Sequence, residues 1–304
     1  MIITTDSNRI TILAQAKINL YLDILSRNAD GYHNILSVMQ SVGLADKLNI
    51  ALLNNEEGIY LSVDTTDVPS DKTNLAYKAA ELFSEPLGYL PNVKIDIEKH
   101  IPVAGGLAGG SSDAAAVLRG LNILYKTNLN LDELCYLGKR LGADVPFCIK
   151  GGSMIAKGIG DILTPCDGLS ENQWIVIACG GEKISTPAAY RALDIKYENF
   201  ELKRDNKIQF DLLCDLLRRK RYNNLEQHRY NIFEEVVLPQ HSIADKALYV
   251  LKESGAYAAF MSGSGPSVCG LFALKEMAEK AKDNLKTVLP VEVFVTQSAP
   301  TNND

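Results

Sequence analysis

The stretch that decides the fold runs Pro102-Val103-Ala104-Gly105-Gly106-Leu107-Ala108-Gly109-Gly110-Ser111-Ser112-Asp113. It joins a strand-like alternation to an alanine-rich helical pattern through four glycines and two serines. Glycine lets the backbone come close to a polyanion and turn consecutive N–H groups toward it. A helix that begins near Ser111 or Ser112 adds the positive end of its dipole. The stretch therefore predicts a phosphate-binding loop and a nucleotide-binding enzyme; a glycine-rich turn capped by a serine or by Asp113 is the alternative.

This phosphate loop differs from the two commonest ones, because it matches neither GxxxxGKS/T nor GxGxxG. It carries no lysine of its own, so the hydroxyls of Ser111 and Ser112 are the candidate groups for a phosphate oxygen or for Mg²⁺. Water supplies much of the Mg²⁺ shell in such sites, and the sequence assigns the metal no certain protein ligand.

Outward from the loop, hydrophobic periodicity divides the first half of the chain into strands and helices. Val93, Ile95 and Ile97 alternate with charged residues and predict the strand that enters the loop. Apolar side chains at three-residue spacing from Ala115 to Leu124 predict the helix that leaves it. The other expected elements are helices near 73–83 and 131–141, two strands at 10–14 and 17–24 separated by a short turn, and a turn at 30–31.

The pattern restarts after Asp167-Gly168, which predicts an α+β protein of two domains, residues 1–169 and 170–304. A second glycine turn, Ser262-Gly263-Ser264-Gly265-Pro266, separates two strands of the second domain. The segment 298–304 is expected to be an unstructured, dispensable tail. The elements expected in the second domain are helices at 186–195, 208–220, 241–254 and 274–287 and strands at 174–178, 257–260, 267–273 and 291–296.

Composition narrows the class of partner. The 304 residues, 46% of them hydrophobic, suffice for a large core. The chain has 31 basic and 37 acidic residues and a net charge of -6, which argues against nucleic-acid binding. The basic run Arg218-Arg219-Lys220-Arg221 follows an apolar helical pattern, so we interpret it as the cationic end of a helix. A small-molecule ligand is therefore expected, with a monomer and a homodimer both left open.

The six cysteines, the N-terminus and the apolar runs bear on location. The cysteines are far apart and form no CxxC pair, so reduced, mostly buried thiols are expected rather than a zinc or redox site. The N-terminus lacks the pattern of a signal peptide, and no apolar run approaches about 18 residues. These features favour a cytoplasmic protein without a membrane segment.

Three further segments carry chemical groups but are ambiguous when each is taken alone. Asp144, between a helix end and a proline, is typical of a cap residue as well as of a catalyst. Lys17, on a predicted strand, is typical of a lysine that reaches solvent. The turn that ends in Tyr32-His33 places an aromatic ring and an imidazole together, which suits either a surface or a platform for a flat ligand ring.

The ordered combination of these segments resembles the GHMP kinase superfamily, whose phosphate loop is Pro-x3-Gly-Leu-x-Ser-Ser or a glycine-rich variant. The resemblance implies a two-domain fold with an N-terminal domain like ribosomal protein S5 domain 2 and a ferredoxin-like C-terminal domain. It also implies ATP and Mg²⁺ as cofactors. It extends from about residue 14 to residue 272, and four segments resemble the branch that phosphorylates a cytidine diphospho-sugar alcohol of the non-mevalonate isoprenoid pathway: 16–20, 30–33, 141–147 and 158–161.

By that resemblance, Asp144 and Lys17 match the catalytic pair of the family. Asp144 would accept the proton of the attacking hydroxyl, and Lys17 would offset the developing charge. The γ-phosphoryl group would move in line from ATP to that hydroxyl. Residues 102–112 would bind the ATP phosphates, and Asn74 would lie near the adenine, although helix capping explains an asparagine there equally well.

The resemblance also implies where the acceptor substrate binds. Asn19 and Thr186 match positions near the substrate, and Tyr32 with His33 matches the position that recognises the cytosine ring. Tyr190 aligns with an aromatic residue on the other face of that ring, so an aromatic sandwich is expected. A kinase for homoserine or mevalonate would share the loop but has no need of Tyr32-His33. A catalytically silent nucleotide-binding protein would have no need to retain the catalytic pair.

The sequence departs from the family pattern in the loop. Ala104 and Ala108 stand where glycine is usual, and we expect alanine there to remove access to positive φ and to add a methyl group beside the phosphates. The segment 261–267 resembles a third glycine motif of the family, which packs close to the nucleotide and the substrate; a plain hairpin turn is the alternative.

Overall fold

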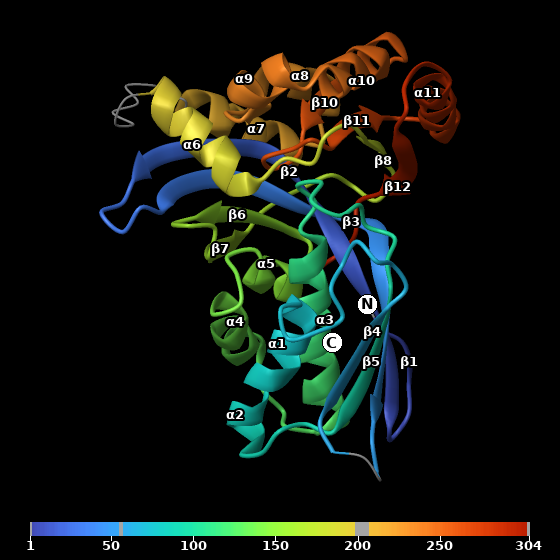
Figure 1. The fold of residues 1–304 in the computed structure, drawn as a ribbon. Coiled ribbons are helices and arrows are strands. Elements are labelled where there is room, and N and C mark those ends of the chain that lie inside the picture. The colour runs from blue at the N-terminus through green and yellow to red at the C-terminus, as the bar shows by residue number, and fades with distance from the viewer. Residues whose placement is uncertain (1, 55–56, 198–206, 303–304) are drawn as a thin grey trace.

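The computed structural model describes residues 2–54, 57–197 and 207–302, and two sheets organise it. The larger sheet has eight strands in the order β1-β2-β3-β5-β4, with β6 paired to β3 and β7, and β9 paired to β2. Helices α1 to α5 pack beside it in the lower part of Figure 1. Its strands are β1 (Ile2–Thr5), β2 (Arg9–Arg27), β3 (His33–Leu52), β4 (Ile59–Val63), β5 (Val93–Glu98), β6 (Ser153–Lys157), β7 (Ile162–Pro165) and β9 (Tyr230–Asn231).

The long hairpin of β2 and β3 connects the two halves of the molecule. The sequence predicts two strands at 10–14 and 17–24, but the structure has one continuous strand whose pairing to β3 shifts between Gln15 and Lys17 and again between Asn19 and Tyr21. Up to Ala14 only alternate residues are buried, whereas from Ala16 to Ile24 both faces are covered. The change of pattern that suggested a turn therefore marks the point where a second layer covers the strand.

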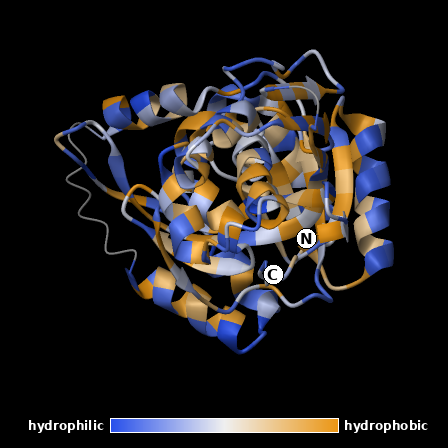
Figure 2. Ribbon diagram, turned by 90° about the horizontal axis from the view of Figure 1, so that it is seen from below, coloured by the Kyte–Doolittle hydropathy of each residue, from blue (hydrophilic) through white to orange (hydrophobic). Residues whose placement is uncertain are grey.

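Helix α3 is the centre of the N-terminal core. Its residues 112–121 are all buried, and a Cβ at Gly120 would lie 2.6 Å from Ile50 Cδ1, so this glycine lets the helix approach β3 closely. Figure 2 shows apolar residues concentrated in the elements at the centre of the molecule. The helices of this half are α1 (Leu75–Leu82), α2 (Ser84–Leu87), α3 (Gly109–Leu124), α4 (Leu131–Lys139) and α5 (Val145–Lys150).

The second sheet is antiparallel and has the order β10-β11-β8-β12. This order, with α10 and α11 packed against the strands, is that of the expected ferredoxin-like domain. The expected strands and helices of this half lie within about three residues of their observed bounds. They are β8 (Trp174–Cys179), α6 (Thr186–Lys196), α7 (Lys207–Arg218), α10 (Ser242–Glu253), β10 (Ala258–Met261), β11 (Val268–Phe272), α11 (Lys275–Val288) and β12 (Glu292–Gln297). The short helices α8 (Leu225–His228) and α9 (Glu234–Val237) and the 3₁₀ turns at Tyr222–Asn224 and Leu238–Gln240 were not predicted.

Two segments cross between the halves, and one of them corrects the expectation of an unstructured tail. Ser298 pairs with Val42, and the Ala299 N–H donates to the Ser41 carbonyl at 2.8 Å. The amide of Asn302 is buried and donates to backbone carbonyls of α5. The tail is ordered because its polar groups form hydrogen bonds with backbone groups of the first half. Residues 303 and 304 lie outside the described residues. The strand β9 likewise pairs with β2, so a division at 169/170 stays a prediction.

Three smaller observations complete the fold. Arg218 and Arg219 at the end of α7 pair with Asp215, as suits the end of an ordinary surface helix.

All six cysteines are free, but only Cys148 and Cys269 are fully buried, so the thiols are less buried than expected. Within the described part of the chain, no helix is both long and apolar enough to span a bilayer.

Candidate active site

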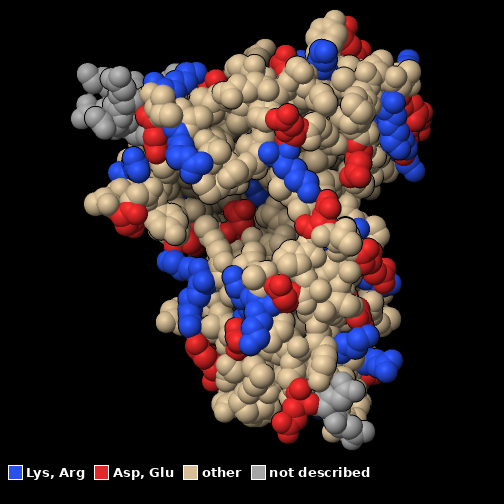
Figure 3. All heavy atoms as spheres, viewed as in Figure 1, with Lys and Arg blue, Asp and Glu red and all other residues tan. Residues whose placement is uncertain are grey.

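A cleft of about 730 Å³ lies between the two halves, with the glycine loop on one wall. Figure 3 shows the molecule hollowed at this level, with acidic and basic side chains around the hollow. Helix α3 begins at Gly109, earlier than the serines predicted to start it. Gly109, Gly110 and Ser111 line the cleft, so the first turn of the helix directs its unpaired N–H groups and its positive dipole end there.

The two alanines of the loop do adopt the conformation expected only of glycine. Ala104 has φ 58° and Ala108 has φ 60°, on either side of Gly106 at 76°. The expectation that alanine removes access to positive φ was therefore wrong, because the packing around the loop holds both residues in the left-handed region. Such a conformation costs an alanine about 1 kcal/mol or more.

The C-terminal glycine turn packs against the glycine loop and forms hydrogen bonds with it. Ser262 Oγ donates to the Gly106 carbonyl at 3.2 Å, and the Ser267 N–H donates to the Gly105 carbonyl at 3.3 Å. A Cβ at Gly106 would lie 2.3 Å from the Ser262 carbonyl oxygen. The segment is thus a tight turn between β10 and β11 that also packs against the glycine loop, while its closeness to a nucleotide and a substrate stays a prediction.

Lys17 and Asp144 meet in this cleft although 127 positions separate them in the sequence. Lys17 Nζ lies 4.0 Å from Asp144 Oδ2 and donates to Asn19 Oδ1 at 2.7 Å. The Lys17 side chain is 6% exposed, so the lysine does not reach for solvent, while Asp144 at the start of α5 is 34% exposed to the cleft. The Lys17 N–H also donates to the Leu107 carbonyl, which joins β2 to the glycine loop.

Asn19 connects this pair to the C-terminal half. Its Oδ1 accepts from the Gly263 N–H at 3.0 Å as well as from Lys17, and its Nδ2 donates to Ser37 Oγ. Asn19 is 2% exposed. Its amide therefore fixes the lysine by a hydrogen-bond network, in which Ser37 in turn donates to the Tyr21 carbonyl.

The serines of the loop differ in what they can bind. Ser112 Oγ donates to the Gln15 carbonyl at 2.6 Å and faces the core, so it is not a ligand for phosphate or metal in this conformation. Ser111 lines the cleft and remains the candidate hydroxyl. Among the described residues there is no group of three or more His, Cys, Asp or Glu side chains that suits a metal ion.

A smaller pocket of about 240 Å³ continues along the other side of the loop, and Asn74 lines it. The Asn74 side chain accepts from the Ala76 N–H and donates to the Pro69 carbonyl, so its first role is to cap α1. Lys99 and Asp113 line the same pocket. Lys99 Nζ donates to Asp113 Oδ2 at 2.7 Å and to Asp46, and burial raises the pKa of Asp113 to about 7 although Lys99 opposes the shift.

The far end of the cleft is built from aromatic and charged side chains. His33 and Tyr190 stack with ring centroids 4.6 Å apart and planes inclined by 26°, while Tyr32 is 61% exposed. A base between the His33 and Tyr190 rings would need them about 7 Å apart, so these two rings alone do not form an open sandwich. Burial raises the pKa of the Tyr190 hydroxyl to about 12, and Asp144 adds to the shift.

Two groups at this end were missed by the sequence reasoning. Asp194 Oδ1 lies 2.7 Å from His33 Nε2, and Asp194 Oδ2 lies 3.5 Å from a guanidinium nitrogen of Arg27. Asp194 stands four residues after Tyr190 on α6, so helical spacing places both on one face. Nearby, the hydroxyls of Thr186 and Ser264 lie 2.9 Å apart, which brings the predicted Thr186 to the C-terminal glycine turn.

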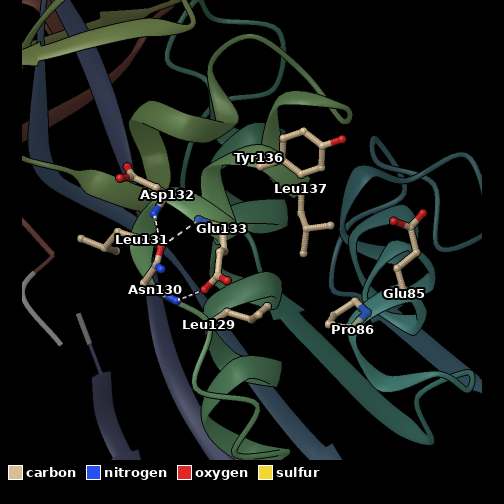
Figure 4. A pocket seen from close by; sticks show the side chains of 9 residues that line it. All are labelled: Glu85, Pro86, Leu129, Asn130, Leu131, Asp132, Glu133, Tyr136 and Leu137. Atoms are coloured by element: carbon tan, nitrogen blue, oxygen red, sulfur yellow. Dashed lines mark hydrogen bonds between the residues drawn. The ribbon is translucent and has the colours of Figure 1, made fainter.

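A wider groove of about 870 Å³ lies away from this cleft, between α2 and α4 (Figure 4). Glu85, Asp132 and Glu133 border it, and none of the described residues that line it is cationic. The capping box of α4, in which Asn130 and Glu133 bond each other's backbone, forms part of its wall. The groove therefore lacks the cationic and N–H donors that a phosphate site requires.

Comparisons with known proteins agree with this geometry. Residues 74–152 match the GHMP kinases N terminal domain, and residues 212–291 match the GHMP kinases C terminal domain. A 4-diphosphocytidyl-2-C-methyl-D-erythritol kinase of Synechococcus sp. is 42% identical over 96% of this chain and 94% of the relative, and that of Geobacillus kaustophilus is 40% identical over 91% and 93%.

Solved structures show the same fold. A crystal structure of 4-(cytidine 5'-diphospho)-2C-methyl-D-erythritol kinase superposes with a TM-score of 0.77 at 30% identity, covering 95% of this chain and 100% of that one. A homoserine kinase from Cytophaga hutchinsonii also reaches 0.77, at 18% identity over 99% and 98%. The fold is thus shared among kinases with different acceptors, and the choice of acceptor depends on the side chains of the site.

Proposed function

The chain belongs to the GHMP kinases, which are ATP-dependent phosphotransferases, and we propose that it phosphorylates the 2-hydroxyl of 4-diphosphocytidyl-2-C-methyl-D-erythritol. The relatives that carry this name match nearly the whole chain. The single observation that carries the proposal is the placement of Asp144 and Lys17 in one cleft with the glycine loop. The cleft therefore contains a base, a cation and a phosphate-binding backbone.

The proposed reaction uses these groups in one step. The substrate hydroxyl gives its proton to the Asp144 carboxylate as its oxygen bonds to the γ-phosphorus. The bond from the γ-phosphorus to its bridging oxygen breaks, and ADP leaves with that electron pair. Lys17, fixed by Asn19, offsets the negative charge that develops beside Asp144. The reaction thus rests mainly on position and electrostatics.

The phosphate chain of ATP is assigned to the start of α3. N–H groups of the loop and the first turn of the helix face the cleft, where they would bind its oxygens. Mg²⁺ bound to the phosphates neutralises their charge. The residues present fit such an ion, because the Ser111 hydroxyl is an oxygen donor in the cleft and would hold Mg²⁺ together with phosphate oxygens and water.

The cytidine end of the substrate is assigned to the far end of the cleft. Tyr32, His33 and Tyr190 provide ring faces and an imidazole there, as base recognition requires. Thr186 and Asn19 line the same cleft, and the sugar alcohol is assigned to the space beside them. A homoserine or mevalonate kinase would need no such aromatic end.

The test is a coupled assay of ADP release with the purified protein and four alcohols. The cytidyl substrate is expected to be phosphorylated, with mevalonate, homoserine and galactose at background. Transfer to one of the other three alcohols alone would refute the assigned acceptor. Absence of ADP release with all four would refute the kinase activity itself.

A further inference from the structure

We propose that Asp194 is a positioning residue for the base-binding end of the cleft, where its carboxylate holds the imidazole of His33 in place. The proposal rests on the proposed function, because it concerns how the same site selects its substrate. Neither the sequence motifs nor the similarity to known kinases pointed to this residue.

The first argument is geometric. Helix α6 contacts the His33 ring twice, with the Tyr190 ring stacked on its face at 4.6 Å and the Asp194 carboxylate bonded to its edge at 2.7 Å. Tyr190 is itself packed edge-on against Phe233, with the ring centroids 4.9 Å apart. The orientation of the imidazole and its distance from α6 are therefore both fixed, because one helix contacts the face and the edge of the ring.

The second argument concerns the proton of the imidazole. A carboxylate accepts hydrogen bonds and donates none when it is ionised, so Asp194 requires that His33 Nε2 carries a hydrogen. A side chain that recognises a nucleobase by hydrogen bonds must present defined donors and acceptors. An imidazole whose tautomer is fixed by a neighbouring carboxylate does so. Asp194 thus determines which ring nitrogen of His33 carries the hydrogen, which a packing contact alone would not determine.

The third argument is the position of the helix. His33 begins β3 immediately after the hairpin turn, and Figure 1 shows the adjoining ends of β2 and β3 beneath α6, with the turn itself projecting to the left. The other Asp194 oxygen lies 3.5 Å from Arg27, on the opposite strand of the hairpin. One carboxylate therefore joins α6 to both strands, and a cation that lines the cleft is held with the imidazole.

The experiment compares three variants of the full chain. Asp194→Ala removes the acceptor, and Asp194→Asn keeps an oxygen acceptor for His33 but loses the charge that pairs with Arg27. Ile195→Asn is the matched control, because Ile195 is the next residue on α6 and is 79% exposed. Ring-nitrogen NMR of His33, assigned with a His33→Asn variant, and steady-state kinetics are measured for each.

For Asp194→Ala we expect changed ring-nitrogen shifts of His33 and a KM for the cytidyl substrate raised about tenfold, with kcat and the KM for ATP within about twofold. Asp194→Asn should lie between Asp194→Ala and the wild type, and Ile195→Asn should match the wild type. Unchanged His33 shifts, or an unchanged KM for the cytidyl substrate, in Asp194→Ala would overturn the proposal. So would equal rises in both KM values.

The free-protein measurement separates this proposal from the assigned activity. If the wild type does not phosphorylate the cytidyl substrate, the proposed function fails, but the NMR comparison is still made and titration with cytidine diphosphate replaces the kinetics. Weaker binding of cytidine diphosphate to Asp194→Ala than to Ile195→Asn then supports the positioning role. Equal binding overturns it.

Discussion

The two ends of the cleft are built in different ways. At the end assigned to phosphate, the groups offered to a ligand are mostly backbone N–H groups, and contacts between Gly106 and Ser262 fix the loop that carries them. At the base end they are side chains of a hairpin tip and of α6, and Tyr32 there is largely exposed. Backbone groups suit a ligand that all members of the family share, whereas side chains can change with the acceptor. In the proposed site, the groups for phosphate transfer and the groups for substrate choice therefore lie at different ends of the cleft.

The largest expected effect tests the point where the two ends meet. Asp144→Asn should lower kcat about a thousandfold, because the amide cannot accept the hydroxyl proton. ATP affinity should stay close to that of the wild type, since the loop backbone is unchanged. Turnover is measured in the coupled assay and ATP binding by calorimetry. Near-normal turnover would remove Asp144 as the base.

The next effect tests the backbone construction of the phosphate end. Gly106→Ala and Gly88→Ala place alanine at nearly the same φ, 76° and 77°, but only at Gly106 does a neighbouring carbonyl block the new methyl group. We expect Gly106→Ala to lower the free energy of unfolding by about 3 kcal/mol or more and Gly88→Ala by about 1 kcal/mol. Urea denaturation measures both, and equal losses would show that φ alone matters.

A smaller effect tests the side-chain construction of the base end. Tyr190→Ala should raise the KM for the cytidyl substrate about tenfold, because it removes the ring that is stacked on His33 and holds it in place, and leave the KM for ATP nearly unchanged. Tyr190→Phe keeps the ring and serves as the control, with values close to the wild type. A similar rise in both KM values would contradict the separation of the two ends.

A pH dependence is expected from the cluster beneath the loop. Burial raises the pKa of Asp113 from 3.8 in the unfolded chain to about 7, so the folded protein holds more protons than the unfolded chain between these values. Asp113 therefore lowers stability as pH rises through this window and adds no further change above it. The stability of Asp113→Asn relative to the wild type should therefore increase from about pH 4 to about pH 7 and stay constant above, measured by urea unfolding. A difference independent of pH would show that Asp113 does not titrate in this range.

The smallest effect concerns the two alanines. Ala104→Gly and Ala108→Gly relieve a left-handed alanine but also free the unfolded chain, so we expect each to change the free energy of unfolding by less than about 1 kcal/mol. Thermal unfolding detects such changes. A loss above about 2 kcal/mol in either variant would show that the methyl groups pack in a way that outweighs the strain.

The sequence predicted helices and strands correctly where their pattern of apolar residues is local. It failed for strands that are buried on both faces because a second layer of the protein covers them. The alternation from Val93 to Ile97 predicted β5, and the loop with the helix after it was predicted with an error of two or three residues at the helix start. The long strand β3 was not predicted, and β2 was divided, because both carry buried polar residues such as Gln40 and Asn19 where the C-terminal half covers them. Ordinary strand patterns assume one open face.

By itself the sequence determined the glycine loop between a strand and a helix, the elements next to it, and the resemblance from which Lys17 and Asp144 were proposed as a pair. These follow from glycine content and from side-chain periodicity, which act over a few residues. Only the tertiary structure decided that Ser112 faces the core, that the tail is ordered, and that Asp194 meets His33 across 161 positions. Those contacts depend on how whole elements pack, and sequence spacing carries no record of that packing.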